Sequence, residues 1–224
     1  MTRPAEADPL AAALRGFGLV GLPAFVVILS GNLIVAPLSA VLVLAWARLS
    51  RTPLASLGFS APASWTMTIV VGILLGILSK LAMKAIVMPL LGAPPINATY
   101  HFIEGNAAAL PGMLWSVIVG AGFGEEVLFR GYLFERWRRL MGSGGQSTVA
   151  CILVTSLFFA VVHLPDQGIP GVQQALFTGL MFGALYAFTG RLWLPMVAHA
   201  AFNVTAVAVI YWGWERAIAG SLFG

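Results

Sequence analysis

The chain has 224 residues, of which 59% are hydrophobic and only 9% are charged, and its mean hydropathy is +0.93. Soluble domains carry about 25% charged residues. The composition therefore excludes an ordinary soluble domain and predicts an all-α, polytopic transmembrane bundle of about seven to eight helices. The net charge of +4 does not indicate a nucleic-acid surface, and a single cysteine, Cys151, excludes an internal disulfide and a multi-cysteine metal site.

Seven apolar segments are expected as membrane spans, separated by short polar or proline-containing stretches. We expect a polar arm over residues 1–9 and a tight turn over residues 30–32. The first span lacks a small-residue cleavage pattern at its end, so it is interpreted as an anchor rather than as a removable signal peptide. The expected spans are residues 10–29, 33–47, 65–91, 113–139, 147–164, 171–188 and 192–212.

Two lysines lie inside the third expected span. Lys80 and Lys84 are four residues apart and therefore share one helix face. Our first interpretation is that their ammonium groups snorkel toward a headgroup region. The alternative is that they pair with an acid of another helix or with a substrate carboxylate.

Glycines at short spacing predict close contacts between helices. Gly179 and Gly183 stand in a small-xxx-small pattern within the sixth span. Gly120, Gly122 and Gly124 precede two acids in the fourth span and do not form a nucleotide-binding fingerprint, because no strand precedes them. We therefore expect both groups to let neighbouring backbones approach.

Basic residues predict the orientation of the chain. If the amino terminus is cytoplasmic, almost all arginines outside the spans lie on the cytoplasmic side, as the positive-inside rule requires. The predicted location is a multi-pass protein of a bacterial cytoplasmic membrane. The cytoplasmic set is Arg3, Arg15, Arg48, Arg51, Arg136, Arg138, Arg139 and Arg191, and Arg216 falls on the other side.

The fourth expected span carries Glu125, Glu126 and Arg130 near its middle. Each such charge costs about 2.5–3.5 kcal/mol at the centre of a lone transmembrane helix, more in total than the apolar side chains return. The helix must therefore face a protein interior or a wet cavity. Glu126 and Arg130 are four residues apart and can pair, which leaves Glu125 free. A buried ion pair that only positions helices is the alternative interpretation.

Two later spans carry polar side chains at helical spacing. His163 follows Phe159 by one turn, and His199 and Asn203 are four residues apart on one face. A lone histidine in a span is more often hydrogen-bonded packing than catalysis. The combination of both histidines, the asparagine and the paired acids favours a functional site instead.

Several chemistries are excluded by the residues present. The chain has no His-Glu-x-x-His pattern, and its aspartates all lie outside the expected spans, so a helical zinc-protease site and an intramembrane aspartate dyad are absent. A glutamate in a dry setting remains, and Glu125 can accept a proton from water there. His163 can hold that water, while His199 and Asn203 can donate hydrogen bonds to a developing oxyanion. This combination describes amide hydrolysis inside a membrane.

Three motifs together resemble those of the CAAX-protease and bacteriocin-processing (CPBP, or Abi) family. They are Glu125-Glu126-x-x-x-Arg130, Phe159-x-x-x-His163 and His199-x-x-x-Asn203, and the resemblance covers about residues 110–212. It implies N-terminal helices over residues 1–109, a catalytic core over residues 110–214 and a tail over residues 215–224, in one integrated bundle.

The family resemblance implies a glutamate-dependent intramembrane endopeptidase. Glu125 and His163 would activate water, His199 and Asn203 would form the oxyanion site, and Glu126, Arg130 and Phe159 would support them. No cofactor is expected, although zinc could be held by Glu125, His163 and His199 if a metal were required. The implied partners are the lipid bilayer and a membrane-embedded or lipid-anchored protein or peptide substrate, with no nucleic acid. Two other classes remain open, a proton-coupled transporter and a non-catalytic immunity or scaffold protein.

Overall fold

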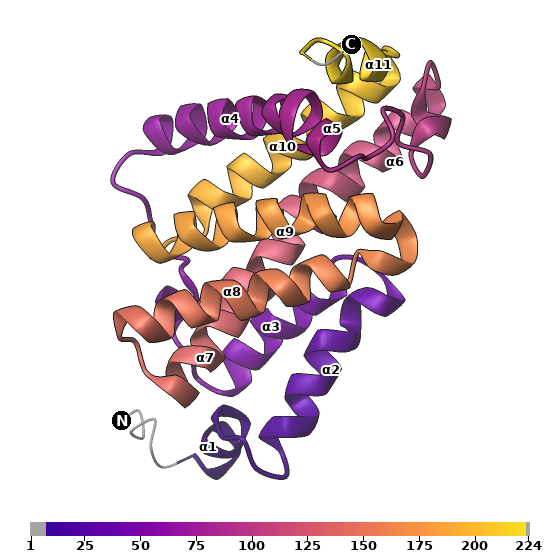
Figure 1. The fold of residues 1–224 in the computed structure, drawn as a ribbon. Coiled ribbons are helices and arrows are strands. Elements are labelled where there is room, and N and C mark those ends of the chain that lie inside the picture. The colour runs from indigo at the N-terminus through magenta and orange to yellow at the C-terminus, as the bar shows by residue number, and fades with distance from the viewer. Residues whose placement is uncertain (1–7, 223–224) are drawn as a thin grey trace.

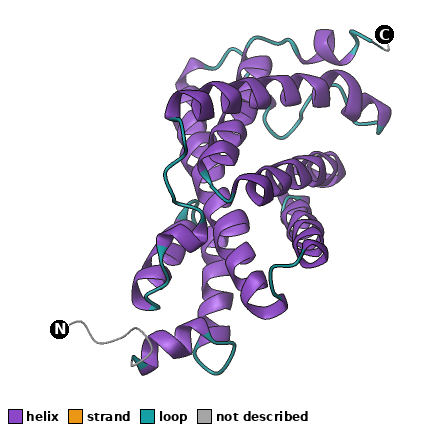
Figure 2. Ribbon diagram, turned by 90° about the vertical axis from the view of Figure 1, so that its left-hand side faces the viewer, coloured by secondary structure: helices purple, strands orange, loops and turns teal. Residues whose placement is uncertain are grey.

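The computed structural model describes residues 8–222, which fold into helices joined by short loops (Figure 1). These described residues contain no β-strand, and the all-α prediction is confirmed (Figure 2). Residues 1–7 of the predicted arm and residues 223–224 of the predicted tail lie outside the described residues.

The α-helices are α1 (Pro9–Arg15), α2 (Gly21–Ile34), α3 (Leu38–Leu49), α4 (Trp65–Ala82), α5 (Met88–Leu90), α6 (Leu110–Trp115), α7 (Leu133–Met141), α8 (Gly145–Val161), α9 (Leu164–Thr189), α10 (Trp193–Tyr211) and α11 (Glu215–Ala219). Short 3-10 helices are η2 (Leu54–Leu57), η4 (His101–Ile103) and η5 (Ala107–Ala109), and the wider π-helices are η3 (Met83–Val87), η6 (Ser116–Glu125) and η7 (Val127–Tyr132).

Three helical stretches of the described chain are long and apolar enough to cross a bilayer. Trp65–Leu90 joins α4, η3 and α5, Ala107–Met141 runs from η5 to α7, and Trp193–Tyr211 is α10. A hydrocarbon core of about 30 Å needs about 20 helical residues, and the three stretches have 26, 35 and 19. Large apolar side chains such as Leu74 and Leu78 are exposed on α4, where lipid rather than water suits them. The chain is an integral membrane protein.

The expected seven full spans are not all present as such. Helices α2, α3 and α8 are apolar but have only 14, 12 and 17 residues, shorter than a full crossing requires. Helix α9 has 26 residues and bends at Gly168, where φ is +62°, a backbone conformation that glycine adopts without steric cost. Short and bent helices therefore pack around a common interior, in place of the seven full-length spans that we expected.

The N-terminal prediction is wrong in two places. The expected first span is interrupted between α1 and α2, because Gly16 ends α1 in an extended conformation and glycine is a poor helix former. The expected turn over residues 30–32 lies inside α2, and the chain instead turns between Ile34 and Leu38. There Asn32 and Ser39 exchange two backbone-to-side-chain hydrogen bonds of 2.9 and 3.0 Å, which hold α2 against α3.

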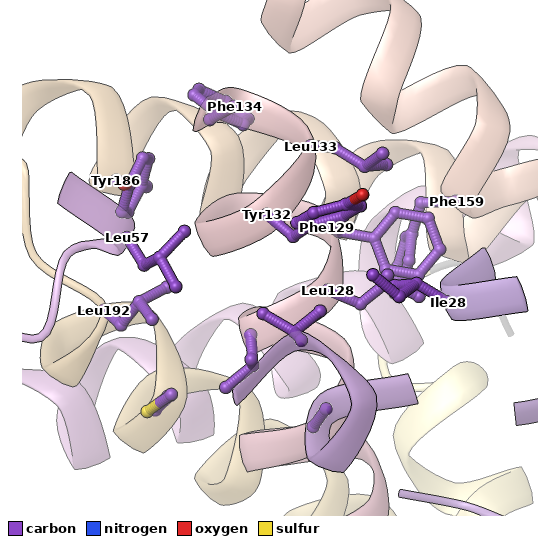
Figure 3. Packing of buried hydrophobic residues seen from close by; sticks show 14 of the residues in the cluster. Ile28, Leu57, Leu128, Phe129, Tyr132, Leu133, Phe134, Phe159, Tyr186 and Leu192 are labelled. Atoms are coloured by element: carbon purple, nitrogen blue, oxygen red, sulfur yellow. The ribbon is translucent and has the colours of Figure 1, made fainter. Parts of the chain in front are cut away.

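The main apolar core surrounds the second half of the long helix Ala107–Met141. Figure 3 shows Leu128, Phe129 and Tyr132 of this helix in contact with side chains from several other elements. The ring of Trp46 in α3 meets Tyr132 edge-on, with 4.9 Å between ring centroids. Burying these large side chains fixes the long helix at the centre of the bundle, so the charged groups just before residue 131 are held inside protein.

Glycines bring helices into close contact around this centre, as predicted. An added Cβ on Gly122 would lie 2.8 Å from the Cβ of Ala200 in α10. An added Cβ on Gly179 of α9 would likewise lie 3.0 Å from the Cβ of Ser156 in α8, and Gly183 also packs against α8. The long helix and α10, and likewise α8 and α9, therefore approach closely enough for short polar side chains to meet.

Three arginines of the predicted cytoplasmic set, Arg15, Arg136 and Arg138, lie in α1 and α7, at one end of the bundle (Figure 1). Arg136 donates a hydrogen bond to the carbonyl of Arg15, and Arg138 donates to the carbonyl of Ser56 in η2. Arg216 lies in α11, which Figure 1 places at the opposite end. The side of the membrane on which each end lies stays a prediction, as do the boundaries at residues 110 and 214.

Candidate active site

One cavity of about 190 Å³ collects side chains from all three sequence motifs. Glu125 comes from the π-helix η6, His163 from the junction of α8 and α9, and His199 and Asn203 from α10. These four residues are far apart in the sequence, and only the packing of the long helix against α10 and of α8 against α9 brings them to one wall.

Glu126 and Arg130 form a buried ion pair beside this cavity. Arg130 Nη1 lies 2.8 Å from Glu126 Oε1, and the side chains are 1% and 0% exposed. Arg130 also donates through Nη2 to the carbonyl of Gly179, and its guanidinium lies over the rings of Phe159 and Phe182. The pairing of Glu126 with Arg130 predicted from their spacing is confirmed.

His199 connects the two acids, a contact that the sequence did not predict. Its Nδ1 lies 2.7 Å from Glu126 Oε1, and its Nε2 lies 3.8 Å from Glu125 Oε2. Because an ionised carboxylate only accepts, Nδ1 carries a proton and donates it to Glu126. Phe182 stacks on the imidazole at 4.6 Å between centroids. The ring is held so that Nε2 faces Glu125.

Glu125 is the less confined of the two acids. Its side chain is 24% exposed, and its buried Oε2 has no hydrogen-bond partner among the described residues. The helix around it is π-helical rather than α-helical, which widens the turn and changes the direction of each side chain. Such wide turns often occur at functional sites. Glu125 thus presents an available carboxylate oxygen next to the cavity.

His163 is oriented by the residue one turn before it. Its Nδ1 lies 2.7 Å from the carbonyl oxygen of Phe159, and the two rings meet edge-on at 4.7 Å. Since a carbonyl only accepts, Nδ1 is the donor and the neutral ring keeps a lone pair on Nε2. Phe159 is 1% exposed and also contacts Arg130, so it joins the first and second motifs.

Asn203 lines the same cavity one turn after His199. Its side-chain amide has no hydrogen-bond partner in the described part of the chain. Both amide hydrogens are therefore available to a ligand.

The described residues contain no group of three His, Cys, Asp or Glu side chains close enough to hold a metal ion. Glu125, His163 and His199, the set considered as zinc ligands, line the same cavity but do not form such a group among the described residues.

The cavity and an adjoining one are also lined by polar groups that the sequence interpretation did not assign to the site. Lys80 is 7% exposed and donates to Gln174 Oε1 at 2.8 Å, so its expected snorkelling is wrong. Lys84 pairs with Glu215 at 2.8 Å, which is the alternative interpretation. The adjacent glutamines of the sixth span were the available signal for Gln174, because paired amides are unusual in an apolar helix.

Tyr100 and Gln167 are two further polar residues of the same cavity. Gln167 Nε2 donates to the hydroxyl of Tyr100 at 3.3 Å, and both residues line the cavity. Burial raises the pKa of Tyr100, and the negative charge of Glu125 raises it further. The hydroxyl is thus a neutral donor and acceptor at the cavity wall.

The part of the chain that carries these motifs is similar to a known family. The family model for type II CAAX prenyl endopeptidase Rce1-like proteins matches residues 107–205, which include all four cavity residues of the three motifs. The family resemblance inferred from the motifs is confirmed. No curated protein and no solved structure matches the chain.

Proposed function

We propose that this chain, whose residues 107–205 match the family model of type II CAAX prenyl endopeptidase Rce1-like proteins, is a member of that family and cleaves its substrate with a water molecule activated by Glu125. The family match and the long apolar helices support a CAAX-type protease of the membrane that acts on membrane-associated proteins. The observation that carries the finer proposal is the meeting of Glu125, His163, His199 and Asn203 at one cavity.

In the proposed first step, Glu125 and His163 hold the attacking water. The water donates one hydrogen to the carboxylate of Glu125 and the other to Nε2 of His163, the two acceptors left open by their surroundings. These two hydrogen bonds direct an oxygen lone pair at the substrate carbonyl. As the C–O bond forms, the proton moves from the water to Glu125, which acts as the general base.

His199 and Asn203 stabilise the oxygen that becomes negative. Asn203 donates from its side-chain amide, which has no partner among the described residues. His199 can donate from Nε2 only if both ring nitrogens are protonated, because Nδ1–H already binds Glu126. An imidazolium balances the charges, since Glu125 and Glu126 then face Arg130 and His199 as two anions and two cations. When the C–N bond breaks, Glu125 returns its proton to the leaving amine.

A cleavage assay with Glu125→Gln tests this proposal. The substrate is an S-prenylated peptide ending in a Cys-aliphatic-aliphatic-X sequence, presented in detergent micelles, and the released fragment is measured by mass spectrometry. Loss of the general base should lower kcat by roughly 10²–10⁴-fold. Glu104→Gln, a matched change in the exposed loop before the long helix, serves as the control and should leave the rate unchanged.

The same variants separate the alternative classes. Wild-type cleavage by folded Glu125→Gln and His163→Ala proteins would contradict the proposal. Proton flux in proteoliposomes that depends on Glu125, without any peptide cleavage, would identify a transporter instead.

A further inference from the structure

Lys80 places a buried positive charge on the wall of the candidate active site. It lies near the end of α4, is 7% exposed and lines the cavity that contains Glu125 and His163. It also lines an adjoining cavity of about 180 Å³, so its ammonium group stands where the two cavities meet.

The ammonium group of Lys80 has no ion-pair partner among residues 8–222. Its one hydrogen bond goes to the neutral amide oxygen of Gln174 at 2.8 Å, and it lies 5.0 Å from the ring centroid of Phe202. An ammonium group has three donors, so two remain. Because a buried charge without a counter-ion is costly, a negatively charged group of a ligand would stabilise the ammonium form of Lys80.

The carboxylate of Glu215 does not pair with Lys80. Its Oε1 accepts from Lys84 Nζ at 2.8 Å and from the backbone N–H of Asn97 at 3.0 Å. Lys84 Nζ also donates to the carbonyl of Pro95 at 2.6 Å. One lysine of the pair is therefore neutralised within the protein, while the other faces the cavity. An intramembrane ionisable group of this kind indicates a role in binding.

We propose that Lys80 binds a carboxylate of the substrate, and that this carboxylate is the free carboxyl terminus. The inference rests on the proposed function, in which the scissile bond lies beside Glu125 in the same cavity. We choose the carboxyl terminus because Lys80 lies where the candidate active-site cavity adjoins a second cavity of only about 180 Å³, which is lined by the Lys84–Glu215 pair and by the loop around Pro94. Lys80 would then select substrates that are cut close to their end.

Three peptides test the source of the carboxylate. The first is an S-prenylated peptide ending in Cys-aliphatic-aliphatic-Ser with a free carboxyl terminus, the second is its carboxamide, and the third is a carboxamide whose last residue is glutamate. A charge-assisted hydrogen bond discriminates by about 10- to 100-fold, so the wild-type kcat/KM should fall by that factor on amidation, mainly through KM. The third peptide should be cut no better than the second.

Variants of Lys80 test whether the preference for a free carboxyl terminus over a carboxamide depends on this side chain. Lys80→Met should bring the ratio between the first two peptides close to one, and Lys80→Arg should retain part of it. The double variant Lys84→Met/Glu215→Gln removes the neighbouring ion pair without leaving a lone buried charge, and it should keep the wild-type ratio. A wild-type enzyme indifferent to amidation, or a Lys80→Met enzyme that keeps the preference, would overturn the inference. Efficient cleavage of the third peptide would overturn the choice of the terminus.

Binding measurements distinguish failure of this inference from failure of the proposed function. Fluorescence anisotropy with the labelled peptides is measured on Glu125→Gln protein, alone and combined with Lys80→Met. A preference for the free carboxylate that disappears with Lys80 supports the carboxylate site even if no peptide is cleaved. Equal binding of acid and amide rejects the site even if cleavage depends on Glu125.

Discussion

Glu126 and His199 are joined by a hydrogen bond of 2.7 Å between Oε1 and Nδ1, and the same oxygen accepts Arg130 Nη1 at 2.8 Å. One buried carboxylate thus holds side chains from two motifs. Glu126 is more than the structural partner of Arg130, because it sets the orientation of the imidazole whose other nitrogen faces Glu125. Such an orienting partner is a positioning residue in the proposed mechanism.

Glu126→Gln should impair both stability and turnover. It leaves Arg130 buried without its counter-ion, which should lower the free energy of unfolding by about 3–5 kcal/mol. It also weakens the hydrogen bond that orients the imidazole of His199, so kcat should fall by roughly 10- to 100-fold with little change in KM. Thermal unfolding in detergent and steady-state kinetics on the folded fraction measure the two effects. A destabilised enzyme with wild-type kcat would show that the contact is structural only.

Asn203→Ala should act on the transition state rather than on binding. Removing one oxyanion donor typically lowers kcat by about 10²–10³-fold, and KM should change little. Thr205→Val is the matched change on the same helix, where the hydroxyl only bonds back to the carbonyl of Ala201. That variant should stay within about twofold of wild type, as most changes outside a site do. Equal losses in both variants would mean that α10 packing, not an amide donor, was disturbed.

Gly122→Val should separate the two walls of the site. Its Cβ would meet Ala200 at 2.8 Å, so the long helix and α10 must move apart, which changes the spacing of Glu125 and His199. We expect a large loss of kcat in protein that still folds. Gly112→Ala in the same long helix has nothing within 4 Å and should be neutral or stabilising by up to about 1 kcal/mol. An active Gly122→Val enzyme would show that the site tolerates a wider helix separation.

Cysteine accessibility tests the transmembrane orientation. The helix from Ala107 to Met141 has 35 residues and is about 50 Å long, more than the thickness of a hydrocarbon core. Cysteines introduced for the exposed Ala108 and Ser143 should therefore react with a membrane-impermeant reagent from opposite sides. The positive-inside rule predicts that Ser143, beside the arginines, is cytoplasmic. Buried Cys151 should not react, and labelling of both introduced cysteines from one side would reject this crossing.

Much of the fold was predictable because composition and helical periodicity are local properties. The apolar runs around residues 65–91 and 192–212 became the helices Trp65–Leu90 and Trp193–Tyr211. The N-terminal elements were predicted less well, because hydropathy does not register that Gly16 ends a helix or that Ser39 stabilises Asn32 within one. Local hydrogen bonds and glycine conformations decide such boundaries.

The sequence by itself determined the class of the protein, its family motifs and the pairing of Glu126 with Arg130, since these depend on composition and on separations of a few residues. Only the tertiary structure decided that Glu126 also holds His199 and that buried Lys80 has no counter-ion among residues 8–222. Those two contacts join residues 73 and 94 positions apart. Contacts over such separations depend on how helices cross and how closely their glycines let them approach, which no periodicity in the chain specifies.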